Sequence, residues 1–247
     1  MNKFFETFKN IWSIKELRDR IIFTLTLLAV FRVGSSIVLP GVIPGVLKNA
    51  ATSNSLFGLI NSYTGGAWNK ASIFALGIMP YITASIIVQL LGFAVPFFQR
   101  LQQKEGESGR RKLNQITRIL TVLVVLVQGG GYLTYLQSIG AVDPGVSQFV
   151  FWFSNSIILA AGTIFCMWLG ERITDRGIGN GTSMIIMIGI IAALPSAFAF
   201  ELQSQLSNNG LIIFIAELVV LFLSVLASIL IVQGVRRVQI NYAKRVV

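Results

Sequence analysis

The sequence contains no histidine, a single cysteine and few charged residues. Cys166 lies in an apolar run, and one cysteine cannot form a disulfide within the chain. The usual zinc ligands are therefore missing, and we expect neither a metal site nor a cofactor. Charged residues make up 12% of the chain, whereas a typical soluble domain has about 25%. A soluble fold with so few charges would not cover its surface.

Enzymatic activity is not expected, because the residues that carry catalysis are absent or scattered. No histidine is available as a general base, no serine or cysteine lies near a base, and no predicted span carries two carboxylates. The run Gly177–Gly181 resembles a phosphate loop superficially. It lacks the following lysine and a preceding strand, so we do not expect nucleotide binding.

Hydrophobic residues make up 54% of the 247 residues, and the formal net charge is +10. Apolar surface on this scale must face lipid or other helices, which indicates an all-α integral membrane protein. A basic balance can also indicate nucleic-acid binding. The positive loops of a membrane protein explain the charge without a nucleic acid.

Long apolar runs predict a polytopic bundle of six transmembrane helices. The predicted spans are 21–38, 71–93, 119–138, 149–169, 182–200 and 211–232. Residues 1–20 form a charged, amphipathic N-terminus, in which 2–17 suit a helix at the membrane interface. The alternative is a tail without regular structure. A charged loop at 100–118 and a basic segment at 233–247 complete the pattern.

The lysines and arginines are distributed unevenly among the loops. Seventeen of the 19 that lie outside the predicted spans fall on alternate loops and on the two ends of the chain. Cationic loops stay in the cytoplasm. Six spans bring both ends to one side, so the charge pattern predicts a multi-pass protein with a cytoplasmic N-terminus.

The outer segment 43–70 is long and polar, and it contains a short apolar stretch from Leu56 to Ile60. This stretch is too short to cross a bilayer. It can fold back at membrane depth, where irregular backbone must line a cavity or be buried in protein. The alternative is an ordinary outer loop.

Two ionisable residues, Arg32 and Glu217, lie within predicted spans. Ionisable residues are costly in hydrocarbon and often mark a functional site. The alternative is a structural ion pair or a side chain that reaches the interface.

Four stretches of the chain resemble the SecY family of bacterial protein-conducting channels. They match the second helix of the family, the cytoplasmic loop after it, the signature before the fifth helix and the start of the loop after the sixth. In chain order they are Ala71–Leu90, Lys104–Lys112, Trp168–Gly181 and Asn241–Arg245. Their order and the six predicted spans fit the family over nearly the whole chain.

The resemblance implies a ten-helix clamshell of two inverted halves around a pore. Residues 21–200 would form the first half, 201–232 the sixth helix and 233–247 the start of the next cytoplasmic loop. We therefore expect the chain to be part of a longer protein. The implied function is that of the central pore-forming subunit of the Sec translocase. That subunit passes unfolded preproteins across the membrane and membrane proteins laterally into lipid.

In this family a ring of apolar side chains closes the waist of the pore. The matching positions are Ile78, Ile82, Thr182 and Ile186. A dry apolar ring blocks ions when idle and fits around passing side chains of any kind. Thr182 departs from the usual aliphatic residue, and its hydroxyl would wet that side of the ring.

The resemblance also assigns segment 55–66 as the plug, a short element beneath the pore on its outer side. Its named residues are Ser55, Leu56, Phe57, Gly58, Leu59, Ile60, Asn61, Gly65 and Gly66. The last two glycines would give the plug a hinge. The second and third helices would form one side of a lateral gate.

The same resemblance implies the partners and the location. The partners would be SecE- and SecG-like small membrane subunits, the SecA motor ATPase, the ribosome, signal sequences, preproteins and the lipid bilayer. Cytoplasmic cations would meet SecA or the ribosome by charge, or would serve only to orient the helices. They are Arg110, Arg111, Lys112, Arg236, Arg237, Lys244 and Arg245. The location would be the inner (cytoplasmic) membrane of a bacterial cell.

The alternative to a channel is a small-molecule secondary transporter. Such a transporter couples ions to its substrate and predicts ionisable residues clustered near the midplane of the membrane. Only Arg32 and Glu217 meet this description in the sequence, and they lie on different predicted helices.

Overall fold

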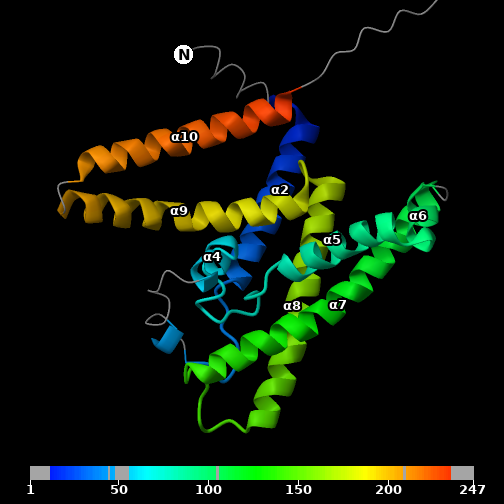
Figure 1. Ribbon diagram of the computed structural model, residues 1–247, viewed down its shortest axis with the longest axis horizontal. Helices are drawn as coiled ribbons and strands as arrows, with labels where there is room; N and C mark the ends of the chain where they lie inside the picture. The colour runs from blue at the N-terminus through cyan, green and yellow to red at the C-terminus, as the bar shows by residue number, and fades with distance from the viewer. Residues whose placement is uncertain (1–11, 44, 48–55, 104–105, 208–209, 235–247) are drawn as a thin grey trace, which may run out of the picture. The chain divides into compact units, whose positions relative to one another are not determined.

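The computed structural model describes residues 12–43, 45–47, 56–103, 106–207 and 210–234 (Figure 1). The helices are α2 (Lys15–Gly34), α4 (Leu56–Tyr63), α5 (Met79–Ala94), α6 (Pro96–Gln103), α7 (Gly106–Ser138), α8 (Gln148–Arg176), α9 (Gly181–Ser207) and α10 (Leu211–Gln233). By length and composition, α7, α8, α9 and α10 can each cross a membrane. The chain divides into two compact units between Ala193 and Leu194.

Helix α2 covers most of the first predicted span. It begins earlier than predicted, at Lys15, and ends at Gly34, so the last four residues of the predicted span lie outside the helix. The run without charge extends only from Ile21 to Phe31, whereas a full span needs about 20 apolar residues. Helix α2 is accordingly absent from the described helices that pass the length and composition test.

The second predicted span, 71–93, differs from the structure in two ways. Residues 71–78 form turns, and α5 begins only at Met79, with Pro80 in its first turn, where proline is favoured. Helix α5 ends before Val95, which is extended (φ −114°, ψ 122°) because the following Pro96 disfavours helical backbone there. Helix α6 then leaves at an angle of 101°. The second predicted span therefore consists of turns followed by most of α5, and the bent pair of α5 and α6 extends beyond its predicted end.

The charged loop predicted at 100–118 is largely helical, which corrects that assignment. Helix α6 continues to Gln103, and α7 begins at Gly106 and runs for 33 residues. Glu107 and Arg111 form an ion pair of 2.8 Å at (i, i+4) spacing. Such pairs and the good helix propensity of charged residues extend the helix beyond the apolar run.

The later spans match their predictions closely. Helix α10 covers the whole predicted range and one further residue, Gln233. Gly210 directly precedes the helix. Helix α9 continues through Pro195 and runs beyond the predicted end of the fifth span at residue 200. Proline is tolerated in membrane helices because neighbouring groups satisfy the freed backbone. The predicted polar stretch after residue 200 is thus helical as far as Ser207.

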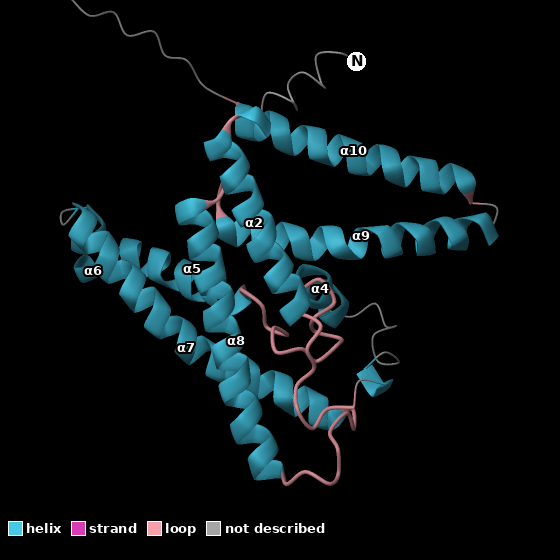
Figure 2. Ribbon diagram, turned by 180° about the vertical axis from the view of Figure 1, so that it is seen from behind, coloured by secondary structure: helices cyan, strands magenta, loops and turns pink. Residues whose placement is uncertain are grey.

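The segment after α2 lies next to the segment between α4 and α5, and the two carry most of the described non-helical backbone (Figure 2). The backbone N–H of Leu39 donates to the carbonyl of Ala71 (2.7 Å), and that of Ile43 donates to the carbonyl of Ala141 (2.8 Å). These bonds satisfy backbone groups that a helix would otherwise satisfy internally. They tie the segment after α2 to the approach to α5 and to the loop between α7 and α8.

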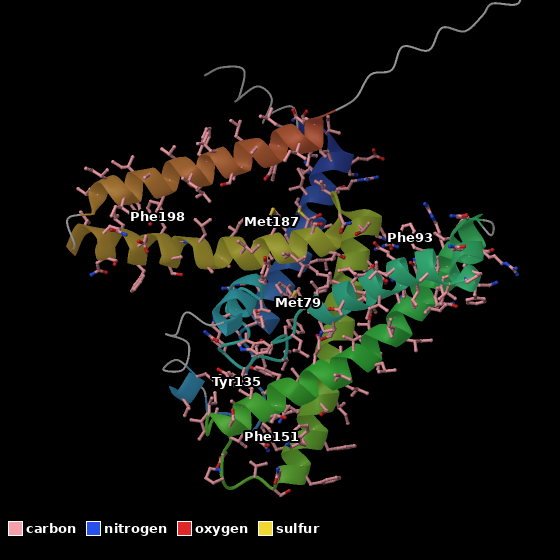
Figure 3. The ribbon with its side chains drawn as sticks, viewed as in Figure 1. Met79, Phe93, Tyr135, Phe151, Met187 and Phe198 are labelled. Carbon is pink, nitrogen blue, oxygen red and sulfur yellow. The ribbon has the colours of Figure 1, made fainter. Side chains whose placement is uncertain are left out.

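One buried group, the Trp68 cluster, lies between α7, α8 and the non-helical segments that carry Leu39 and Trp68. Its largest members are Leu39, Trp68, Tyr132, Leu136 and Phe151. The Tyr132 hydroxyl donates to the Trp68 carbonyl (2.7 Å), and the two rings lie 4.3 Å apart between centroids. Figure 3 labels Phe151 on α8, which is fully buried here.

A second buried group, the Ile78 cluster, joins α2, the approach to α5, α8 and α9. Its members include Phe31, Phe74, Ile78, Leu169 and Ile185. The Phe31 and Phe74 rings stack, with centroids 5.8 Å apart. This cluster positions the candidate site described below.

The second compact unit contains the end of α9 and α10. Phe198 of α9 meets Phe214 of α10 edge to face, with ring centroids 5.3 Å apart (Figure 3). Phe214 is the buried residue of α10, and the other side chains of this helix are exposed and mostly apolar. Glu217 is exposed on this helix.

Candidate functional site

A small cavity of about 100 Å³ lies where α2, the turn after α4, the start of α5 and α9 meet. Met79, labelled in Figure 3, marks the start of α5. The residues that line the cavity are Phe31, Tyr63, Thr64, Gly77, Ile78, Met79, Ile82, Ile185 and Ile186. No ionisable side chain other than tyrosine lines it, so the cavity is essentially apolar.

Three of the four residues predicted for the pore ring come together in this cavity. Ile78 is buried and caps α5, and the N–H of Ile82 donates to the Ile78 carbonyl (3.2 Å), so the two side chains lie one turn apart. Ile186 approaches from α9. Ile82 and Ile186 are half-buried. The structure thus assembles an aliphatic patch from two helices that are about 100 residues apart in sequence.

Thr182, the fourth residue, does not line the cavity. It lies in the first turn of α9, one turn before Ile186. Its hydroxyl is close to Gly170 of α8, where an added Cβ would lie 3.4 Å from it. The polar group therefore faces the α8 contact, and a role for Thr182 in a ring stays a prediction.

The predicted plug is a short helix followed by a tight turn. Helix α4 spans Leu56–Tyr63, and Ser55 lies outside the described residues. Gly65 and Gly66 have positive φ values of 64° and 87°, which a residue with a side chain adopts only with strain. Their predicted action as a hinge is not tested by this geometry.

Asn61 organises the turn that follows α4. Its carbonyl accepts from the N–H of Gly66 (2.9 Å) and from the hydroxyl of Thr64 (3.2 Å). Its side-chain oxygen accepts from the N–H of Asn69 (3.0 Å). The end of the segment is thus a defined structure whose Tyr63 and Thr64 reach the cavity.

Arg32 connects α2 to this turn. Its guanidinium Nη1 donates to the carbonyl oxygen of Gly65 at 2.6 Å. Charge-assisted bonds of this kind are shorter and stronger than neutral ones. The sequence flagged Arg32 as an ionisable residue inside a span, but the 33-residue separation from Gly65 carried no pattern that identifies the partner.

Outside segment 55–66, sequence reasoning missed five contributors to the site. They are Phe31, Gly77, Met79 and Ile185, which line the cavity, and Gly189 of α9, which packs against the turn at Gly65. Ile185 directly precedes a predicted ring position, and Phe31 directly precedes Arg32. Their position next to predicted residues is the one signal in the sequence that could have identified them. A helix that is apolar all round has no polar face to show which side lines a cavity.

The predicted cytoplasmic cations divide into two groups. Arg110, Arg111 and Lys112 lie near the start of α7 and are exposed. The other four, from Arg236 onward, lie outside the described residues.

Comparison with known sequences identifies the family. The SecY family model matches residues 72–246. The protein translocase subunit SecY of Escherichia coli strain K12 is 42% identical over 241 residues, and that of Bacillus licheniformis is 44% identical over 251 residues. The alignments cover 94% and 97% of this chain but 54% and 57% of the relatives. The chain therefore spans about half the length of the curated relatives it matches.

Solved structures share the fold. Sec61 in the canine ribosome–channel complex from the endoplasmic reticulum has a TM-score of 0.59 and 21% identity, over 91% of this chain and 49% of that one. A structure of a protein-conducting channel has a TM-score of 0.52 and 21% identity, over 77% of this chain and 41% of that one. The family model covers more than half of the chain, and the sequence relatives exceed 40% identity. This helical membrane protein therefore belongs to the SecY family.

Proposed function

We propose that this chain forms part of the central pore-forming subunit of a Sec protein translocase in a bacterial cytoplasmic membrane, with its N-terminus in the cytoplasm. The complete channel passes unfolded preproteins across the membrane and membrane proteins laterally into lipid. The main support is the apolar cavity in which Ile78, Ile82 and Ile186 meet Tyr63 and Thr64 of the plug segment.

The geometry supports a passive seal. Isoleucine side chains from α5 and α9 face one small cavity, and the plug segment covers the same cavity. A dry apolar constriction opposes ions, because an ion loses its hydration there and gains no polar partner. Separation of α5 from α9, together with withdrawal of the plug segment, would open the path. No chemical step is required of this chain, and partner proteins would supply the driving force.

A charged substitution in the cavity tests this function. Ile82→Asp in the complete channel should wet the constriction, raise the ion conductance of the idle channel in planar bilayers and weaken discrimination between intact and defective signal sequences. The matched control is Gln89→Asp, which adds the same charge to the exposed side of α5 two turns later. Unchanged conductance and unchanged discrimination in Ile82→Asp would show that these residues do not form the seal.

The exposed cations near the start of α7 support contacts with cytoplasmic partners. Arg110, Arg111 and Lys112 offer a local positive field to an acidic surface of SecA or to ribosomal RNA. Replacement of all three by glutamate should weaken binding of the channel to SecA or to the ribosome, and binding by the unaltered channel should fall with added salt. If the binding of both partners did not change, these cations would serve only to orient the helices in the membrane.

No observation favours a small-molecule transporter. Arg32, one of the two ionisable residues predicted within spans, bonds to the carbonyl of Gly65 and, among the described residues, to no carboxylate. An ion-coupling site needs ionisable groups whose charge or occupancy changes during transport.

The SecE- and SecG-like subunits are proposed as lateral partners in the membrane on the strength of the family alone.

A further inference from the structure

Arg32 lies at the end of α2, one residue after Phe31, which lines the cavity. Its side chain is half-buried and crosses to the plug segment, where Nη1 donates to the Gly65 carbonyl at 2.6 Å. The acceptor is a main-chain oxygen. The bond therefore fixes the path of the segment whatever side chains that segment carries.

Helix α9 also packs against Gly65. A Cβ built on Gly65 would lie 2.8 Å from the Cα of Gly189 and 3.0 Å from Arg32 Nη1. A Cβ built on Gly189 would lie 2.7 Å from the carbonyl oxygen of Tyr63. These distances are shorter than normal van der Waals contacts, so neither glycine has room for a methyl group. The main chain after α4 thus packs into a slot formed by the Arg32 side chain and the backbone of α9.

We infer that Arg32 and Gly189 form a latch that holds the plug segment in the closed position, with Arg32 as a positioning residue that sets how readily the channel opens. This inference rests on the proposed function. The cation gains a strong acceptor only while Gly65 is in the slot, and withdrawal of the segment removes that acceptor. The latch therefore stabilises the closed state relative to the open state and raises the threshold that a signal sequence must overcome.

Arg32→Met in the complete channel removes both the charge and the donor and keeps an unbranched side chain, which is shorter than arginine. Closed-state occupancy is read by crosslinking of Tyr63→Cys to Ile186→Cys, two positions that line the same cavity, with a short bismaleimide. The buried Cys166 is left in place, and samples with one introduced cysteine give the background. Arg32→Met should lower the crosslinking yield and raise export of a preprotein with a defective signal sequence, on the order of tenfold.

Arg32→Lys separates a latch from a merely structural role. Lysine retains the charge and a donor, so it should restore much of the crosslinking yield and of the signal-sequence discrimination. Export of a preprotein with an intact signal sequence, and the amount of channel in the membrane, should be similar in all three forms. Equal crosslinking in the Arg32, Met and Lys forms would overturn the latch.

Gly189→Ala tests the other side of the slot and leaves Arg32 intact, which keeps the inference testable if Arg32→Met does not fold. The added methyl meets the Tyr63 carbonyl, so it should displace the segment and lower the crosslinking yield in the same direction. The matched control is Gly130→Ala on α7, where a Cβ makes an ordinary contact of 3.7 Å with Trp152. A control that changed crosslinking as much as Gly189→Ala would count against the latch.

The two proposals fail in distinguishable ways. Crosslinking reports the position of the plug segment in the resting protein and needs no transport. If Ile82→Asp makes the channel leak while neither Arg32→Met nor Gly189→Ala alters crosslinking, the latch is wrong and the channel function stands. If Ile82→Asp has no effect while crosslinking falls in both latch variants, the latch stands and the assignment of the seal is wrong.

Discussion

The Trp68 cluster and the Ile78 cluster are both apolar, but they are held together differently. In the first, the Trp68 and Tyr132 rings pack together beside a pocket of about 340 Å³, and the buried Tyr132 hydroxyl donates to the Trp68 carbonyl. The second borders a cavity of about 100 Å³ that is lined by buried and half-buried isoleucines. Its polar tie runs from Arg32 to the main chain of the plug segment. The first cluster is built as a fixed frame, and the second as a closure that can release.

This contrast predicts that stability and conductance of the idle channel respond to different substitutions. Substitutions in the Trp68 cluster should lower stability without changing conductance of the idle channel. Substitutions around the cavity should change conductance with a small cost in stability. The expected effect on stability falls from Gly162→Val through Tyr132→Phe to the ion pair between Arg118 and Glu171.

Gly162 of α8 lies where the two clusters adjoin, because Ile73 packs against both. A Cβ on Gly162 would collide with the carbonyl oxygen of Ile73, which is backbone and cannot move aside. Gly162→Val should therefore destabilise the protein by about 3 kcal/mol or more, within the range for overpacking at a close backbone contact. Folded protein in a detergent denaturation series measures this, with Gly130→Ala as control. Normal stability would mean that α8 does not lie against this backbone.

Tyr132→Phe tests the frame more gently. The substitution keeps the ring and removes the hydroxyl that donates to the Trp68 carbonyl. The unfolding free energy should fall by about 1–2 kcal/mol because a buried acceptor loses its partner. Conductance of the idle channel should not change. A leaking Tyr132→Phe channel with normal stability would reverse the assignment of frame and closure.

The sequence predicted the helices well where apolar runs end at clear polar residues. The sixth span, 211–232, is α10 almost residue for residue. It failed where charge was taken to mean loop, since the first turns of α7 carry Glu107 and Arg111 and are helical. It also placed the start of the second span at residue 71, whereas residues 71–78 form turns and α5 begins at Met79.

The candidate site was predictable only in part. The resemblance named Ile78, Ile82 and Ile186, and the structure brings these three to one cavity. The contact between Gly65 and Gly189 could not be predicted, because it joins two backbones more than 100 residues apart and leaves no side-chain pattern. Arg32 was visible as a costly charge in a span, but the acceptor is a carbonyl that every residue has.

The ion pair between Arg118 and Glu171 should have the smallest effect, although it is the best-formed one on the surface. Arg118 Nε and Nη2 donate to the two carboxylate oxygens at 3.2 and 2.7 Å, which joins α7 to α8. The Arg118 side chain is 52% exposed, so water and salt screen the attraction. A double-mutant cycle with Arg118→Met and Glu171→Gln should give a coupling of roughly 0.2–1 kcal/mol that shrinks with added salt. A coupling free energy as large as the fall in unfolding free energy in Tyr132→Phe would mean that this pair holds α7 and α8 together as strongly as the Trp68 cluster does. The fixed frame would then include a charged pair at its surface.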